Sequence, residues 1–222
     1  MSTRHRGVIA AVVLTGAMVL GACSSHSSSG SHSGMNGGSS SISIPPNADF
    51  NATDVGFAQG MIPHHTQAIE MADMAVAANA GPQVLALAQR IKAAQNPEIQ
   101  TMSTWLRQWN QTVPDVGEGS MSNGSHDMSN MSGMMMDGMM SKADMTRLAE
   151  SKGTAFDRLW VELMIQHHEG AVRMAKDEVA EGKNPAAQAL AASIITSQEA
   201  EIQEMNALLT TLPNEERLVT QQ

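Results

Sequence analysis

The stretch 61–65, of sequence MIPHH, recurs as MIQHH at 164–168. A shift of 103 positions superimposes the two stretches, and the match continues without a gap from position 54 to position 106 of the first copy. Identical polar and apolar residues recur throughout this span, including Asp54 as Asp157 and Glu98 as Glu201. Agreement over this length predicts two copies of one structural unit.

Each copy has the pattern of two helices joined by a short turn. The turns are expected at 79–82 and 182–185, where a glycine ends one helix and Pro82 or Pro185 opens the next. Pro63 and Pro97 lie inside the expected helices of the first copy and should bend them locally. The predicted fold class is therefore all-α, a four-helix bundle of two helical hairpins at 50–112 and 143–212, with a tail at 213–222.

Heptad spacing puts polar side chains on the helix faces that should meet in the core. His65 and Glu98 lie at similar distances from the first turn, so they should face each other in an antiparallel hairpin. A buried polar group needs such a partner, because leaving it unpaired costs about 1–3 kcal/mol. The predicted layers are Met61 with Met102, His65 with Glu98, Met164 with Met205, and His168 with Glu201.

A mixture of histidine and methionine in these layers is typical of a copper site. Imidazole binds several transition metals, whereas thioether sulfur selects Cu(I). Adjacent histidines on a helix diverge by about 100°, so the two members of each pair should face different partners. The alternative for a single methionine is core packing, and for a single histidine a hydrogen bond. The predicted metal ligands are His64, His65, Met61, Met71, Met102, His167, His168, Met164, Met174 and Met205.

Four carboxylates in this seam could take part in the same site. A carboxylate either binds a metal directly or orients a histidine that binds it. The pattern leaves both roles open for Asp54, Glu98, Asp157 and Glu201.

The connection at 113–142 is rich in Gly, Ser and Asn, which predicts a flexible crossover. Eight of its residues from Met121 to Met140 are methionine. Exposed linkers do not normally accumulate an oxidisable apolar side chain, so we expect an arm that gathers soft metal ions. The alternative is a low-complexity linker with some hydrophobic collapse. The predicted donors are His126, Met128, Met131, Met134, Met135, Met136, Met139 and Met140.

The first 22 residues have the pattern of an export signal, with Arg4 and Arg6 followed by an apolar run at 8–20. This run is shorter than the roughly 20 residues that span a bilayer. The sequence LGAC at 20–23 resembles a bacterial lipobox, which predicts lipidation of Cys23 and a position on the outer side of the cell membrane. An uncleaved signal anchor is the alternative. The Ser, Gly and His tether at 23–49 should remain a mobile spacer.

Composition narrows the classes of function further. The 222 residues carry 13 basic and 22 acidic side chains, a formal net charge of -9, which argues against a nucleic-acid partner. A single cysteine excludes an internal disulfide framework. Nineteen methionines against six aromatic residues predict an aliphatic, methionine-rich core.

The two HH stretches resemble the paired signatures of the domain of unknown function family 305. The resemblance covers about 50–110 and 155–210, and it includes Gln67-Ala68 with Met71 and Gly170-Ala171 with Met174. It implies a ferritin-like four-helix bundle with metal ligands at the histidine and methionine positions. The CopM-like members of the family are periplasmic or surface copper-binding proteins. Two features depart from the signature: Gln166 replaces Pro63 in the second copy, which puts equal affinity of two sites in doubt, and the methionine-rich insert is not required by the family.

These patterns predict an exported copper-binding protein that captures or sequesters Cu(I), and also Cu(II) or Ag(I), without catalysis. Its partners would be the metal ion and, through a lipid on Cys23, the membrane. A ferritin-like oxidase is the first alternative, but no glutamate is followed by histidine three positions later, as di-iron sites of that fold require. A metal-free helical interaction module is the second alternative.

Overall fold

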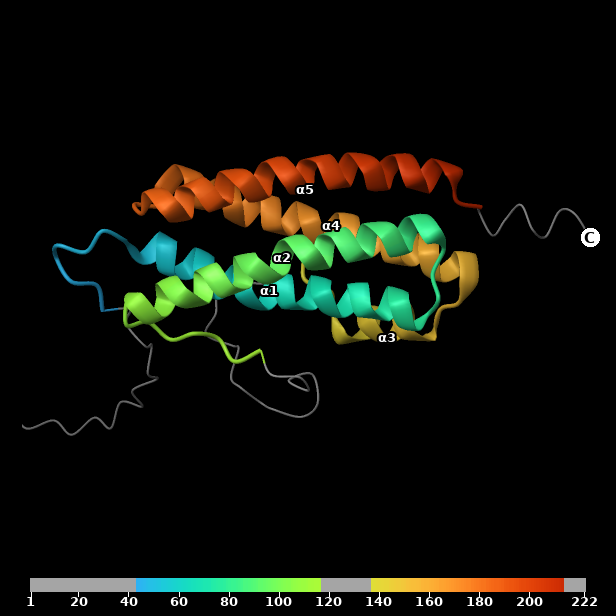
Figure 1. The fold of residues 1–222 in the computed structure, drawn as a ribbon, viewed down its shortest axis with the longest axis horizontal. Helices are drawn as coiled ribbons and strands as arrows, with labels where there is room; N and C mark the ends of the chain where they lie inside the picture. The colour runs from blue at the N-terminus through green and yellow to red at the C-terminus, as the bar shows by residue number, and fades with distance from the viewer. Residues whose placement is uncertain (1–42, 117–136, 214–222) are drawn as a thin grey trace, which may run out of the picture. The chain divides into compact units, whose positions relative to one another are not determined.

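The computed structural model describes residues 43–116 and 137–213, which form helices α1 (Ala52–Ala77), α2 (Pro82–Gln108), α3 (Lys142–Glu150), α4 (Gly153–Glu181) and α5 (Pro185–Thr211). Helices α1 and α2 form one hairpin, and α4 and α5 form the other (Figure 1). The predicted all-α class and four-helix bundle are confirmed. The short helix α3 is an addition that the sequence pattern did not indicate, and it packs against the bundle through Met145 and Leu148.

Helices α1, α3 and α5 begin after residues whose side chains satisfy free backbone amides. Asn51 precedes α1 and accepts hydrogen bonds from the amides of Thr53 and Asp54, while the Asp54 carboxylate accepts one from the Asn51 amide. Asn184 caps α5 in the same way, with proline as the first helical residue, as the sequence predicts. Pro63 and Pro97 lie within α1 and α2, and both helices continue through them.

The glycines of the two turns are needed for space and not for a left-handed backbone. Gly81 and Gly182 have φ of -58° and -63°, whereas Asn79 takes the left-handed conformation at the end of α1. A Cβ on Gly81 would lie 2.6 Å from Oδ2 of Asp157, and one on Gly182 would lie 2.2 Å from Oε1 of Glu178. Each turn is therefore shaped to receive a carboxylate.

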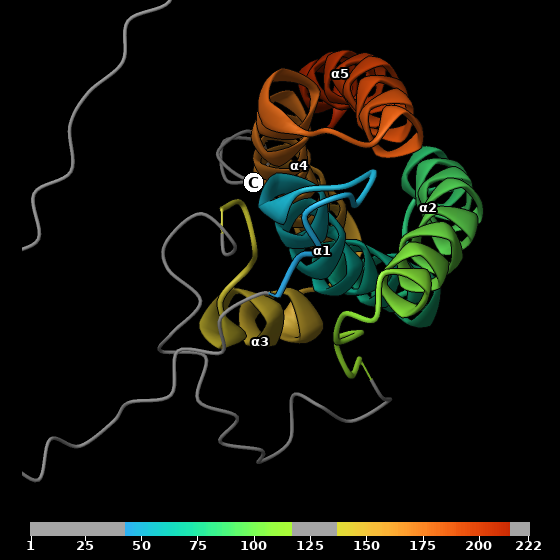
Figure 2. The ribbon, with the colours of Figure 1, turned by 90° about the vertical axis from the view of Figure 1, so that its left-hand side faces the viewer.

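Each turn is tied to the beginning of the other hairpin. The Asp157 carboxylate near the start of α4 accepts the Gly81 amide at 2.9 Å. The Asp54 carboxylate near the start of α1 accepts the amides of Lys183 at 3.1 Å and Asn184 at 2.8 Å. These reciprocal contacts make α1 and α4 antiparallel. Helices α1 and α4 form the centre of the bundle, with α2 and α5 along one side (Figure 2).

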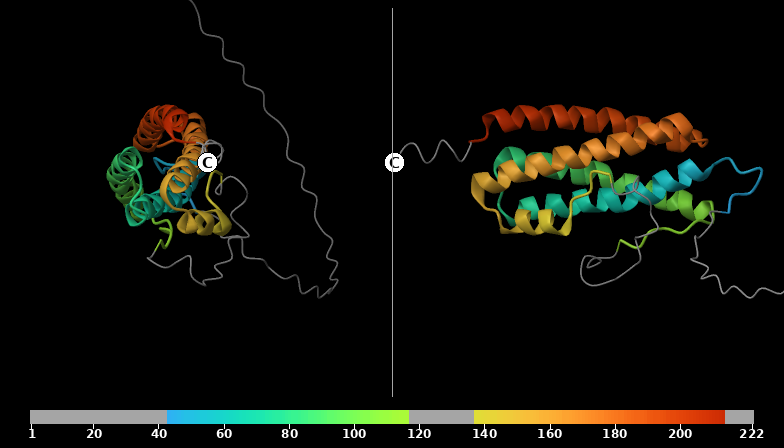
Figure 3. Two further views of the ribbon diagram at one scale, coloured as in Figure 1. Left: turned by 90° about the vertical axis from the view of Figure 1, so that its right-hand side faces the viewer. Right: turned by 180° about the vertical axis from the view of Figure 1, so that it is seen from behind.

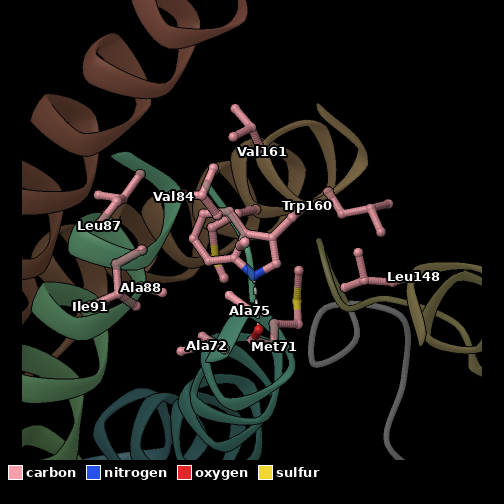
Figure 4. Close-up of a cluster of buried hydrophobic side chains, with 14 of the residues drawn as sticks. Met71, Ala72, Ala75, Val84, Leu87, Ala88, Ile91, Leu148, Trp160 and Val161 are labelled. Carbon is pink, nitrogen blue, oxygen red and sulfur yellow. Dashed lines mark hydrogen bonds between the residues drawn. The ribbon is translucent and has the colours of Figure 1, made fainter. Parts of the chain in front are cut away.

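Two apolar clusters occupy the two ends of the core. One contains Met71, Leu87 and Trp160, whose indole nitrogen donates to the Met71 carbonyl at 2.8 Å (Figure 4). The other contains Phe57 and Ile194. Between these clusters, on all four long helices, lies a set of polar side chains that we term the polar layer: His64, His65, Gln95, Glu98, His167, His168, Gln198 and Glu201.

Within the described ranges 43–116 and 137–213, no helix has the length and apolar character needed to cross a membrane. The predicted signal at 1–22, Cys23 and most of the tether lie outside these ranges.

Candidate metal site

His64 and His167 meet in the polar layer where α1 lies against α4. Their ring centroids are 3.7 Å apart with an interplanar angle of 40°. Both residues are 0% exposed, and no nitrogen of either ring has a partner in hydrogen-bond geometry, although the Asp137 backbone lies near the His64 ring and the His64 backbone near the His167 ring. Four buried imidazole nitrogens without partners are unusual, because buried polar atoms are normally satisfied. We refer to these two residues as the outer histidine pair.

The environment keeps the outer histidine pair neutral. Burial, with the neighbouring His65 and His168 adding to it, lowers the pKa of His64 to about 3. Burial and then His64 lower the pKa of His167 well below its ordinary value. A neutral imidazole keeps a lone pair on one ring nitrogen, and this is the form that binds a metal ion.

His65 and His168 form a second, inner pair that is held by carboxylates. Nε2 of His65 lies 2.7 Å from Oε2 of Glu98, and Nε2 of His168 lies 2.8 Å from Oε2 of Glu201. A carboxylate accepts the Nε2 proton, so Nδ1 of a neutral ring carries the free lone pair. Both Nδ1 atoms are buried without a partner. The predicted facing of each histidine with its glutamate is confirmed, and the carboxylates take the orienting arrangement known from metal-binding histidines.

Methionine sulfurs lie on both sides of the polar layer. Met61 and Met102 belong to one apolar cluster, as predicted for a shared level, and both are 0% exposed. Met164 and Met205 belong to the other cluster and are equally buried. Met61 and Met164 precede the outer histidines by one helical turn, so a thioether is available from either side.

Met71 and Met174 lie farther from the histidines, two helical turns beyond His64 and His167. Met71 is buried in an apolar cluster. Met174 is half-buried and lines a surface pocket of about 340 Å³ with Phe57, Glu178 and Glu181. The structure does not bring either sulfur to the polar layer.

Asp54 and Asp157 also lie away from the polar layer. Their oxygens accept backbone amides of the two turns, as described above. This gives both carboxylates a structural role that explains their burial without a metal. Heptad position predicts a ligand role for Asp54 and Asp157 because it places both on the helix face that meets the core. It does not determine which end of the other hairpin that face contacts.

The crossover at 113–142 is described at 113–116 and from position 137 onward. Met139 is half-buried, and Met140 is 8% exposed and belongs to an apolar cluster. Met140 is therefore part of the core and not of a mobile arm, contrary to the sequence expectation. The other predicted donors lie outside the described residues: His126, Met128, Met131, Met134, Met135 and Met136.

Gln95 and Gln198 are polar-layer residues that the list of predicted ligands omitted. They are 3% exposed each, and the side-chain carbonyl oxygen of each lacks a partner. They lie one turn before Glu98 and Glu201 on α2 and α5. Gln95 and Gln198 are related by the same shift of 103 positions as the histidines, and this repetition could have identified them as members of the polar layer.

The polar layer and the turns beside it offer nitrogen and sulfur donors and no cluster of carboxylates among the described residues. In the described part of the chain, no three His, Cys, Asp or Glu side chains converge as a group that could hold a metal ion. The unpartnered atoms offered instead are imidazole nitrogens, with thioether sulfurs one turn away. Nitrogen with sulfur is the combination that favours copper, whereas hard ions prefer clustered carboxylates.

Comparison with known proteins places this architecture among its relatives. The family described as "Domain of unknown function (DUF305)" matches residues 54–209. No curated protein matches the chain. A solved DUF305 protein from Streptomyces coelicolor is 32% identical, with a TM-score of 0.62, and the match covers 72% of this chain and 93% of that one.

CopM is a second similar protein of known structure. Its Cu(I)-bound form is 31% identical to this chain with a TM-score of 0.57, and the match covers 72% of this chain and 98% of CopM. Its Cu(II)-bound form matches at 34% identity and a TM-score of 0.56, over 71% of this chain and 96% of CopM. A silver-bound form of CopM matches at 30% identity and a TM-score of 0.55, over 72% of this chain and 98% of CopM.

Proposed function

Because this chain belongs to the DUF305 family, we propose that it shares the metal-binding role of its copper-bound relative and captures or sequesters copper. Cu(I) is the favoured ion, and Cu(II) and Ag(I) are further ions for the same donors. The outer and inner histidine pairs, with Met61, Met102, Met164 and Met205, would supply the ligands. Binding itself is the proposed function, in copper tolerance or handling.

The observation that carries this proposal is the outer histidine pair. Two neutral, fully buried imidazoles lie in ring contact with all four nitrogens unpartnered. Leaving buried polar atoms unpaired is costly for a structure that gains nothing from them. A ligand that accepts nitrogen lone pairs would account for the arrangement, and the nitrogen and sulfur donors support a soft transition-metal ion as that ligand.

Titration of the apo protein with Cu(I) against a chromogenic chelator tests the site. We expect the tightest binding step to disappear in His64→Ala/His167→Ala, while the control Gln166→Ala, an exposed neighbour in the same motif, keeps it. Circular dichroism would show that the double variant remains helical. Undiminished Cu(I) affinity in a folded double variant would contradict the assignment.

A ferritin-like oxidase is the enzyme alternative, and the geometry gives it less support. Such sites take a Glu from each of two helices and a Glu-x-x-His motif from each of the other two. Here Glu98 and Glu201 each face a histidine, and Asp54 and Asp157 accept turn amides. Oxygen consumption on addition of ferrous iron to the apo protein would favour the oxidase over the binding role.

We also propose that the protein is exported and anchored by a lipid on Cys23. The support is the signal pattern at 1–22 and the lipobox-like LGAC at 20–23. Expression of Cys23→Ala in a bacterial host should move the protein from the membrane fraction to the soluble exported fraction. Equal partition of both forms would contradict the anchor.

A further inference from the structure

One short segment breaks the two-fold symmetry of the bundle. Residues 137–140, which we term the cover segment, run from the described end of the crossover to α3. They cross α1 and α4 on the side away from α2 and α5, as the yellow chain in Figure 2 and in the right panel of Figure 3 shows. The outer histidine pair belongs to the same two helices.

Gln67 of α1 holds the end of the cover segment. Its side-chain nitrogen donates to the Met140 carbonyl at 3.0 Å, and its side-chain oxygen accepts the Met140 amide at 2.7 Å. Gln67 is 2% exposed, so both hydrogen bonds are shielded from water. A single buried amide thus satisfies both backbone groups of Met140.

Gly170 of α4 provides the space for the beginning of the segment. A Cβ on Gly170 would lie 2.1 Å from the carbonyl oxygen of Asp137, and one on Gly138 would lie 2.7 Å from Cα of Gly170. Gly138 itself has φ of +78°, a backbone conformation that favours glycine. Gly170 and Gln67 are equivalent positions of the repeat, so the segment explains why they differ.

An ion pair on the surface adds a third contact. The Arg173 guanidinium donates to both carboxylate oxygens of Asp137, with Nη2 lying 2.7 Å from Oδ1. The pair is about half exposed, which makes it a weak and reversible contact. Because Arg173 is one turn beyond Gly170, it fixes the same end of the segment.

The three contacts lie directly beside the outer histidine pair. Gln67 and Gly170 each follow an outer histidine by one helical turn, on the same helix face. Asp137 is close enough to His64 to act on it electrostatically through its backbone and its carboxylate. On the opposite side of α1 and α4, the inner histidines and their glutamates separate the outer pair from the surface between α2 and α5.

We propose that the cover segment is a displaceable cover over the outer histidine pair, and that Gln67, Gly170 and Arg173 determine how often it opens to admit a metal ion. The inference rests on the proposed function for the identity of the ion only. The contacts of Asp137 and Gly138 with α4 are local, so this end of the segment can lift while Gln67 keeps Met140 in the core and the antiparallel helices stay undisturbed. The bundle would then supply the site, and the segment would control its rate of filling.

The metal-free protein tests the cover directly. Diethylpyrocarbonate modifies neutral imidazole, and mass spectrometry of peptides gives its rate at His64 and His167. In Gly170→Ala the new Cβ collides with Asp137, so we expect the rate to rise on the order of tenfold, whereas Gly56→Ala should leave it unchanged because nothing lies within 4 Å of the added Cβ.

A surface variant keeps the test valid if Gly170→Ala folds poorly. Arg173→Ala removes the exposed ion pair to the cover segment, and we expect labelling of His64 and His167 to rise about two- to fivefold. Lys176→Ala is the matched control, since Lys176 pairs with Glu199 of α5 from the same helix at similar exposure. No increase in either cover variant, or an equal increase in the controls, would overturn the cover.

Stopped-flow binding of Ag(I) distinguishes this inference from the proposed function. We expect Gly170→Ala and Arg173→Ala to bind Ag(I) faster, in proportion to their labelling rates, with unchanged stoichiometry. Faster labelling with unchanged Ag(I) rates would overturn control of metal access. Absence of Ag(I) and Cu(I) binding in all forms would instead remove the proposed function, and the labelling result would still decide whether the segment covers the histidines.

Discussion

At the scale of single residues, the two histidine pairs differ in what their side chains contribute to stability. Each inner histidine satisfies a glutamate that is 18% exposed, so it contributes a hydrogen bond to the fold. Each outer histidine is buried with both ring nitrogens unpartnered. The outer pair therefore destabilises the apo protein, and the ligand that we propose would offset this loss, which is the relation expected between stability and function at a binding site.

This difference predicts opposite effects of apolar substitution. We expect His64→Leu/His167→Leu to melt at the same temperature as the wild type or higher, because it removes unpaired buried nitrogens. His65→Leu/His168→Leu should lose about 1–3 kcal/mol, since two glutamates lose their partners. Calorimetry of the apo forms measures both effects. A marked loss of stability in the outer double variant would indicate a structural role for that pair.

Glu178 is a further buried polar residue that destabilises the fold. It has no counterpart in the first repeat, where Ala75 occupies the equivalent position. It is 0% exposed, and its carboxyl group has no side-chain partner apart from Asp54, which lies beside it. Burial, with Asp54 nearby adding to it, raises the pKa of Glu178 to about 8. The carboxyl group is therefore protonated at neutral pH, in the space that Gly182 leaves.

A raised pKa in the folded state predicts how stability depends on pH. The stabilisation from a protonated Glu178 is complete below the ordinary pKa of a glutamate, 4.5, and is lost as the pH rises through about 8. Glu178→Gln stays neutral. The melting temperature of this variant minus that of the wild type should therefore increase between pH 5 and about pH 8 and stay constant above that pH. Melts of both proteins across this range measure the gain. Glu181→Gln, an exposed carboxyl at the same pocket, serves as the control, and a constant difference for Glu178→Gln would refute the shift.

At the scale of elements, the reciprocal contacts of Asp54 and Asp157 decide how the hairpins associate. A helical hairpin with an apolar seam can pack against another in several directions. A carboxylate that accepts amides from the other hairpin's turn selects one of them, because in any other arrangement that buried charge would be unpaired.

Removal of one such contact should cost much more than removal of a surface ion pair. Asp54→Ala eliminates the carboxylate half of the α1 capping box and the contacts to Lys183 and Asn184, so we expect a loss of about 2–4 kcal/mol in urea unfolding. Asp73→Ala on the same helix breaks only the exposed pair with Lys92 and should cost about 0–1 kcal/mol. Similar losses in the two variants would contradict the role of Asp54.

The hairpins and their internal register could be predicted because both depend on local information. A short turn between two helices determines which residues face each other, and His65 with Glu98 and His168 with Glu201 follow from it. Contacts between hairpins could not be derived in this way. Asp54 and Asp157 look like members of the seam until the antiparallel packing of α1 and α4 brings each to the opposite turn.

The cover segment and α3 escaped prediction for a related reason. Met140 stands at the end of a Gly, Ser and Met sequence with no periodicity, and the contacts that bury it come from Gln67 on a distant helix. Buried Glu178 was missed because its equivalent, Ala75, is an ordinary core residue. In both cases tertiary packing determined the burial of a residue, and the local sequence predicted a different environment.

At the scale of the whole molecule, the polar layer divides the core into two apolar clusters and places the proposed ligands at its centre. A metal bound there would contact both hairpins at once, through α1 and α4. Binding energy would then oppose separation of the hairpins and stabilise the entire bundle.

Copper should therefore raise the melting temperature of the bundle. The crossover should affect only the number of metal ions bound per chain. Free Cu(I) at 100 times its dissociation constant adds about 2.7 kcal/mol of stability. Replacement of 117–136 by a Gly/Ser linker of the same length, which keeps the connection to the cover segment, should lower the number of ions bound but preserve the melting shift. Calorimetry with equilibrium dialysis measures both quantities. A melting temperature that does not respond to copper would favour a metal-free interaction module.

Each hairpin supplies a carboxylate that binds the turn of the other hairpin, so the folding of each half depends on the other. Asp54 completes the turn of the second half and Asp157 that of the first, so neither half satisfies its own backbone alone. A protease cut within 117–136 would break the covalent chain, yet the two fragments should remain associated as a heterodimer. The same complementarity would let two copies of one ancestral hairpin pair as a homodimer before any duplication joined them.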